Sequence, residues 1–98
     1  MERRLMTAEE IRAALVNLDG WKAEDGSLKK RYEFENFAGA LIFVNKIGAL
    51  AEAVDHHPDI KLGWGYAEVN LTTHDRGGIT DVDNALASKI DKADDKAK

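Results

Sequence analysis

The sequence predicts an α+β fold of two layers, in which a four-stranded antiparallel sheet carries three helices on one face, in the order α-β-β-α-β-β-α. Three segments have apolar residues at helical spacing, and the two pairs of segments between them alternate apolar and polar residues around glycine-containing turns. Helices against one face of an antiparallel sheet are the simplest packing for this order. Because the chain has 98 residues, we expect residues 1–98 to form a single domain, with termini frayed over about 1–5 and 93–98.

The first and last helices begin at start signals. Thr7-Ala8-Glu9-Glu10 has the form of a capping box, in which the threonine hydroxyl and the glutamate carboxylate each accept a hydrogen bond from a free backbone N–H group. We expect the first helix to end at Asp19-Gly20, and the last to open at Thr80-Asp81-Val82-Asp83. The apolar stripes are Ile11, Ala14, Leu15 and Leu18 in the first helix, and Val82, Leu86 and Ile90 in the last.

Two hairpins are predicted between the helices. Asp25-Gly26 favours the positive φ angles of a tight turn, so we expect strands at 21–23 and 28–35. Lys30 is a charged exception on a face that we otherwise expect to be apolar. The expected inward residues are Leu28, Tyr32 and Phe34 in the first hairpin, and Ile60, Leu62, Trp64, Ala67, Val69, Leu71 and Thr73 in the second. The opposite face of the sheet is polar and should remain open.

The middle helix is apolar over more of its circumference than contact with one sheet requires. Asn36 can cap its start, and it should run from Phe37 to Val54. Two explanations are open: a core helix packed on both the sheet and another helix, or a helix that also forms a subunit interface. We expect it to stop at Asp55, because Pro58 cannot continue a helix and disfavours helical geometry in the residue before it. The adjacent histidines 56 and 57 then lie on the exit turn.

The composition argues against several classes of protein. The net charge of −4, without a basic stripe, is unlike that of proteins that bind nucleic acid through clustered lysines and arginines. The sequence has no cysteine, no signal segment and no apolar run of membrane-spanning length. We therefore expect a cytoplasmic protein that binds neither a membrane nor nucleic acid directly.

The three histidines, His56, His57 and His74, are the candidates for chemistry. A metal site is disfavoured, because adjacent histidines before a proline lack the one-turn helical spacing of common metal pairs and no cysteine accompanies them. Nucleophilic catalysis is disfavoured, because the sequence has neither a cysteine nor a Gly-x-Ser-x-Gly elbow. Histidine titrates near neutral pH, so two of them can donate and accept protons without a cofactor. The alternative is that each histidine or carboxylate is only a helix-end or surface group.

The pattern Glu52-x-x-Asp55-His56-His57-Pro58, then Thr72-Thr73-His74, then Gly78-x-Thr80-x-x-Asp83-x-x-Leu86-Ala87 resembles the signature of the pterin-4a-carbinolamine dehydratases. The resemblance implies a single domain that dehydrates 4a-hydroxytetrahydropterin to quinonoid dihydropterin in tetrahydrobiopterin recycling, without a metal or cofactor. It makes His56 and His74 the acid and base, in an order that the sequence leaves open, and gives His57 a role mainly in substrate binding. The other implied substrate-binding residues are Glu52, Asp55, Pro58, Thr73 and Asp83, and the carboxylates could orient the imidazoles or bind the pterin.

The resemblance also implies partners. Members of the family form homodimers or homotetramers and are linked to aromatic amino-acid hydroxylases. Animal members also serve as a dimerisation cofactor of a transcription factor. The alternative function is therefore a protein-binding adaptor that acts through the apolar helix at 37–54.

Overall fold

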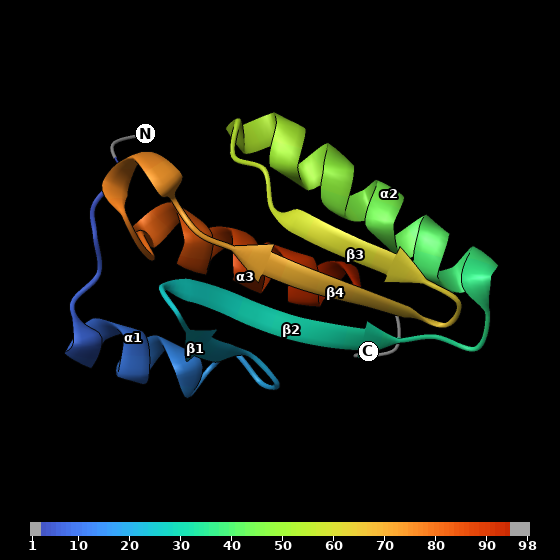
Figure 1. Ribbon diagram of the computed structural model, residues 1–98, viewed down its shortest axis with the longest axis horizontal. Coiled ribbons are helices and arrows are strands. Elements are labelled where there is room, and N and C mark those ends of the chain that lie inside the picture. Colours follow the sequence, from blue (N-terminus) through green and yellow to red (C-terminus); the bar gives the residue numbers. More distant parts are fainter. Residues whose placement is uncertain (1–2, 95–98) are drawn as a thin grey trace.

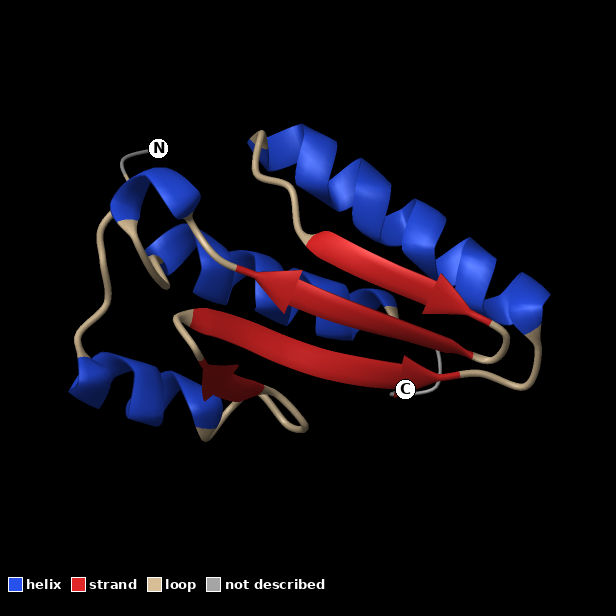
Figure 2. Ribbon diagram, viewed as in Figure 1, coloured by secondary structure: helices blue, strands red, loops and turns tan. Residues whose placement is uncertain are grey.

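The computed structural model describes residues 3–94 and confirms the predicted fold class and element order (Figure 1, Figure 2). Its helices are α1 (Ala8–Leu15), α2 (Phe37–Val54) and α3 (Asp81–Ala93), with a 3-10 turn, η1, at His74–Arg76. Its strands are β1 (Lys22–Glu24), β2 (Ser27–Glu33), β3 (Asp59–Gly63) and β4 (Tyr66–Leu71). All strand pairs are antiparallel, in the spatial order β1-β2-β4-β3.

The core lies between the sheet and the pair formed by α2 and α3, which pack beside each other (Figure 1). Alternate residues of β2 and β4 enter it, because successive side chains of a strand point to opposite faces. Its buried members include Leu28, Tyr32, Val69 and Leu71 from the sheet and Phe43, Ile47, Leu86 and Ile90 from the helices. The other face of the sheet carries charged side chains such as Lys29, Arg31, Lys61 and Glu68, which confirms the expected open polar face.

Local signals set the ends of most elements. Asp25 and Gly26 have φ angles of 52° and 76°, as the tight turn of the first hairpin requires. The capping box at Thr7 is present, and the Asn36 side chain accepts a hydrogen bond of 2.8 Å from the Gly39 N–H group. The helix α1 ends at Leu15, earlier than the predicted stop at Asp19-Gly20. Leu18 is still buried, because a turn after the helix returns it to the core.

Trp64 corrects the prediction for the third strand. We expected it to alternate inward with Ile60 and Leu62, but β3 ends at Gly63 and Trp64 lies in the turn, 71% exposed. Gly65, with a φ of 79°, closes this turn, and the ring of Tyr66 lies where a Cβ atom on Gly63 would be. The strand therefore ends before Trp64, although the apolar alternation in the sequence continues to that residue.

Lys30, the charged residue on the inward face of β2, has a specific set of partners. Its ammonium group donates to Asp91 Oδ1 at 2.9 Å and to the carbonyl oxygen of Asp19 at 2.7 Å. The same Asp91 oxygen accepts hydrogen bonds from Trp21 Nε1 at 3.0 Å and from the Tyr32 hydroxyl. Burial, followed by the bond to Asp91, raises the pKa of Tyr32. This cluster joins the sheet to the last turns of α3.

Residues 3–6, part of which we expected to fray, form backbone hydrogen bonds with residues 79–81. Met6 donates its N–H to the carbonyl of Ile79 at 3.0 Å, and the N–H of Asp81 donates to the carbonyl of Arg4 at 3.1 Å. The Arg4 guanidinium lies 3.1 Å from Glu10 and lowers the pKa of that carboxyl to about 2. The expectation of fraying for residues 1–2 and 95–98 lies outside the described residues.

Among residues 3–94, α2 alone is long and apolar enough to cross a membrane, judged by length and composition. We expected no such run. Four of its residues, Ala40, Phe43, Ile47 and Ala51, are buried in the protein, and the core helix of a soluble protein passes the same test. The absence of a membrane partner stays a prediction.

Candidate active site

The exit turn of α2 separates the two adjacent histidines. The helix ends at Asp55 as predicted, but Asp55 takes a left-handed conformation with φ 50° and ψ 47°. The N–H of His56 returns to the carbonyl of Ala51 at 3.1 Å, and that of Asp55 to the carbonyl of Glu52 at 3.3 Å. These are the two bonds of a Schellman motif, so this turn ends the helix before Pro58 can. It turns His56 into the protein, while His57 is left exposed.

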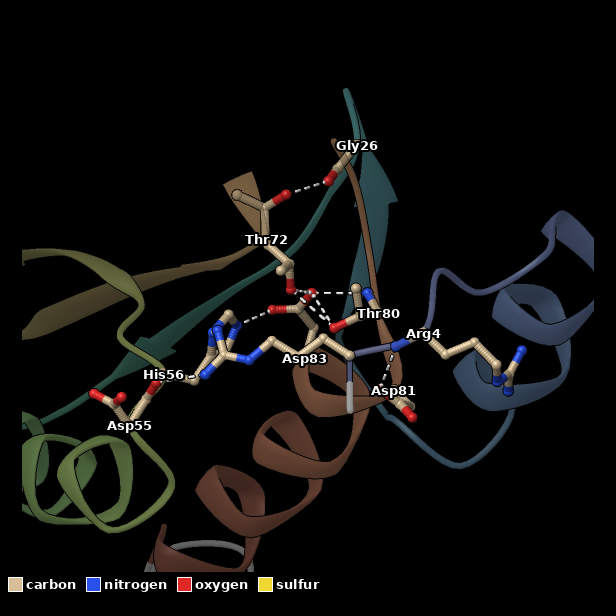
Figure 3. Close-up of polar contacts among 10 residues, drawn as sticks. Arg4, Gly26, Asp55, His56, Thr72, Thr80, Asp81 and Asp83 are labelled. Carbon is tan, nitrogen blue, oxygen red and sulfur yellow. Dashed lines mark hydrogen bonds and ion pairs between the residues drawn. The ribbon is translucent and has the colours of Figure 1, made fainter. Parts of the chain in front are cut away.

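His56 forms a buried pair with Asp83 from the first turn of α3 (Figure 3). The distance from His56 Nε2 to Asp83 Oδ1 is 2.5 Å, and the two residues are 5% and 0% exposed. A carboxylate oxygen accepts, so Nε2 carries the hydrogen. The carboxylate thereby fixes the orientation of the ring, as a histidine that exchanges protons requires.

Asp83 uses its second oxygen to join the segment between β4 and η1 to the start of α3. Oδ2 accepts a hydrogen bond from the Thr73 hydroxyl at 2.8 Å and from the Thr80 N–H group at 2.8 Å. The bond to Thr80 is one half of the capping box of α3, and the hydroxyls of Thr73 and Thr80 are 2.8 Å apart. Thus one side chain caps a helix, holds His56 and fixes Thr73, the residue before η1.

Arg3 occupies the other nitrogen of the His56 ring. Its Nη1 lies 3.1 Å from His56 Nδ1, and its Nη2 donates to the carbonyl oxygen of Asp55 at 2.6 Å. A guanidinium has only donors, so Nδ1 must be the acceptor. The ring is therefore the neutral tautomer with its hydrogen on Nε2, and both of its nitrogens are engaged.

His57 pairs with Glu52 on the surface. Its Nε2 forms a hydrogen bond with Glu52 Oε2, and the two side chains are 53% and 77% exposed. Both residues come from the end of α2, one on its last turn and one just beyond it. This imidazole is exposed, whereas that of His56 is buried.

His74 lies on η1, exposed, and forms no side-chain hydrogen bond with another residue in the described range 3–94. It is linked to the buried pair through its neighbour Thr73, which donates to Asp83. The structure thus places the three histidines in three environments: one buried and doubly bonded, one paired on the surface and one free within the described chain.

The other predicted site residues divide by burial. Thr73 and Asp83 are 1% and 0% exposed and direct their polar groups at each other, Thr80 and His56. The Asp55 side chain is exposed, and Pro58 is partly exposed. Within residues 3–94, no three His, Asp or Glu side chains are grouped so that they could hold a metal ion.

Two contributors were not predicted as site residues. Thr80 was predicted only as a helix start, although its capping partner Asp83 was identified, so the capping box was the available signal. Arg3 lies in a segment that we expected to fray, and no pattern in the sequence connects it to a histidine 53 residues later.

Comparisons with known proteins show that most of this chain is similar to one protein family. The model of the family described as pterin 4 alpha carbinolamine dehydratase matches residues 4–93. Relatives from a Picosynechococcus species and from Mycobacteroides abscessus are 45% and 46% identical over 87 residues, which cover 89% of this chain and 95% and 93% of theirs. Both are named, provisionally, as pterin-4-alpha-carbinolamine dehydratases.

Two solved structures share the fold. A transcriptional coactivator/pterin dehydratase from Brucella melitensis has a TM-score of 0.86 and 33% identity, covering 92% of this chain and 97% of its own. A pterin dehydratase-like protein identified as a RuBisCO assembly factor in the alpha-carboxysome has a TM-score of 0.63 and 25% identity, covering 76% and 87%. These two similar structures thus include one described as a coactivator and dehydratase and one described as an assembly factor.

Proposed function

This chain belongs to the pterin-4a-carbinolamine dehydratase family, and from that membership we propose that it removes water from 4a-hydroxytetrahydropterin to give quinonoid dihydropterin. The reaction needs a proton delivered to the leaving hydroxyl group and another removed from the neighbouring ring nitrogen, so it requires one acid and one base. The observation that carries the proposal is the buried His56–Asp83 pair, which fixes the tautomer of a histidine in the family motif.

We assign the base to His56. Because its Nε2–H is directed to Asp83, Nδ1 is the one ring nitrogen that can accept a proton from the substrate. When Nδ1 takes that proton the ring becomes an imidazolium, and the adjacent carboxylate stabilises the new charge. Thr73 and Asp83 act in this proposal by orienting His56, since both are buried.

We assign the acid to His74, which is exposed on η1 and directly follows Thr73. Protonated His74 would donate to the departing 4a-hydroxyl group, and a second turnover would require it to regain a proton from solvent. His57, held by Glu52, and the exposed Asp55 carboxylate would bind the pterin, whose amino and amide edge offers hydrogen-bond donors. Pro58 would complete this surface beside His57.

The test is dehydration of freshly generated 4a-hydroxytetrahydropterin, followed by absorbance in a stopped-flow instrument. Replacing both His56 and His74 with Ala should reduce the rate to the uncatalysed value. Arg12→Met is the matched control, because Arg12 is exposed and pairs with Glu9 on α1. A double variant that keeps the wild-type rate, while the control is unaffected, would refute the proposal.

A second candidate function is a protein-binding adaptor that acts through α2. The observation that favours it is a set of large apolar side chains on this helix, Phe37, Leu41 and Ile42, which are 43%, 41% and 58% exposed. The coactivator and assembly-factor descriptions of the two similar structures point in the same direction. Ile42→Glu should abolish binding to a purified partner and leave dehydration unchanged. If sedimentation shows that the substitution only separates copies of this chain, the face is a subunit interface instead.

The family membership also supports the wider setting that we propose: tetrahydrobiopterin recycling beside an aromatic amino-acid hydroxylase, assembly as a homodimer or homotetramer, and a cytoplasmic location. The apolar face of α2 suits such an assembly. Sedimentation of the purified protein tests the oligomer, and cell fractionation tests the location.

A further inference from the structure

The segment containing Arg3 contacts both turns that carry histidines of the site. The Arg3 guanidinium reaches His56 Nδ1 and the carbonyl oxygen of Asp55 on the exit turn of α2. The carbonyl oxygen of Arg3 accepts a hydrogen bond of 3.1 Å from Arg76 Nε on η1, the turn that begins at His74. One residue therefore links the two turns.

The partners of the Arg3 side chain differ from those of the other arginines near the N-terminus. Arg4 and Arg12 pair with Glu10 and Glu9, respectively. The Arg3 guanidinium instead bonds to a ring nitrogen of His56 and to the carbonyl oxygen of Asp55. The His56 ring thus lies between a cation on Nδ1 and a carboxylate on Nε2. An N–H group aimed at Nδ1 leaves no room for a hydrogen on that nitrogen.

We propose that Arg3 is a positioning residue that holds His56 Nδ1 free of a proton, ready to act as the base, until an N–H group of the substrate replaces the guanidinium. Asp83 accepts from the ring at Nε2 and the guanidinium donates toward Nδ1, so both contacts fit a ring that carries its hydrogen on Nε2. Without Arg3, we infer that Nδ1 carries a hydrogen in a larger share of the molecules. The effect on catalysis rests on the proposed function, but the effect on the ring does not.

The direct test is nitrogen NMR of the protein labelled with ¹⁵N in histidine, at pH 7. Wild-type His56 should show an unprotonated Nδ1 and a protonated Nε2. In Arg3→Met, which keeps an apolar stem but removes charge and donors, the Nδ1 signal should move toward its protonated position. Arg3→Lys retains a charged donor and should restore the wild-type signal, while Arg12→Met should not change it. An Nδ1 signal that is the same in wild type and Arg3→Met overturns the proposal.

Kinetics separate positioning from the alternatives. Arg3→Met should lower kcat about tenfold, a part of the 10²- to 10⁴-fold that a general base contributes, and leave KM within about twofold. A faster variant would mean that Arg3 only obstructs Nδ1, and a raised KM with unchanged kcat would mean that it binds substrate; either result contradicts the proposal. If the wild-type protein has no dehydratase activity, only the proposed function is refuted. The NMR result would still decide whether Arg3 keeps His56 Nδ1 free of a proton.

Discussion

His56 Nε2 and Asp83 Oδ1 lie 2.5 Å apart in the interior and join the end of α2 to the start of α3. The carboxylate is fully buried and also accepts hydrogen bonds from Thr73 and from the backbone of Thr80. A buried charge is tolerated where its oxygens are satisfied in this way. The pair therefore supports both the packing of the two helices and the orientation of the imidazole.

Asp83→Asn should destabilise the protein by about 2–4 kcal/mol and slow dehydration. The amide has one oxygen in place of two, so its NH₂ group must face either the His56 Nε2–H or the Thr80 N–H, both of which are donors. Urea unfolding at pH 7 measures the loss. Asp25→Asn is the control, because it removes an exposed carboxylate from a turn that accepts asparagine equally well. Equal stability of the two variants would show that the network contributes little.

The sequence predicted the parts of this arrangement that depend on neighbours in the chain. The strand alternation, the Asp25-Gly26 turn and the capping box at Thr7 are local, and the structure has all three. The end of α1 and the place of Trp64 were wrong, because apolar residues continue past the element in each case and only the tertiary turn decides where it stops.

The site was less predictable than the fold, because its bonds join distant residues. His56 and Asp83 were both identified, yet their separation of 27 positions hides which carboxylate meets which histidine. Glu52 and His57 are near enough in sequence for a pair to be expected, and one is present. Arg3 could not be found, since a short N-terminal segment becomes ordered only by pairing with residues 79–81.

His57→Ala should affect binding more than stability. The pair with Glu52 is largely exposed, and surface pairs of this kind contribute about 0–1 kcal/mol to the free energy of unfolding. If the imidazole binds the pterin, loss of one hydrogen bond of about 1 kcal/mol raises KM roughly fivefold. Steady-state kinetics and urea unfolding of the same preparation distinguish the two effects.

Glu52→Gln serves as the companion to this change, because it keeps the length of the side chain and removes the charge that holds His57. It should give a smaller rise in KM than His57→Ala. A fall in kcat at constant KM in either variant would instead indicate that His57 takes part in the proton transfer.

Tyr32 should make the protein sensitive to alkaline pH. Burial and the bond to Asp91 raise its pKa above the ordinary value of about 10. A group whose pKa is raised in the folded state stabilises fully below its unfolded pKa, and this contribution is lost as the pH rises above about 10. Urea unfolding between pH 9 and about 11 should therefore show a falling free energy of unfolding.

Tyr32→Phe removes this dependence and costs about 1–2 kcal/mol at pH 7, because Asp91 loses one of its donors. Tyr66→Phe is the control, since Tyr66 is partly exposed and its ring stacks under the guanidinium of Arg31. The same alkaline slope in wild type and Tyr32→Phe would exclude Tyr32 as its source.

Asp55→Gly should stabilise the protein although it alters a predicted substrate-binding residue. Asp55 adopts a left-handed conformation, with φ 50°, that costs a residue with a Cβ about 1 kcal/mol and costs glycine nothing sterically. We expect the free energy of unfolding to rise by about 0.5–1 kcal/mol in Asp55→Gly and to fall by a similar amount in Asp55→Ala, which lacks the local hydrogen bonding that aspartate offers in this region.

The reverse change, Gly77→Asp at φ 75° with no atom within 4 Å of the added Cβ, measures the same cost without crowding. If Asp55 binds the pterin edge, Asp55→Gly combines higher stability with a higher KM. If Asp55→Gly is instead less stable than wild type, the Asp55 side chain stabilises the exit turn, and the strain argument is refuted.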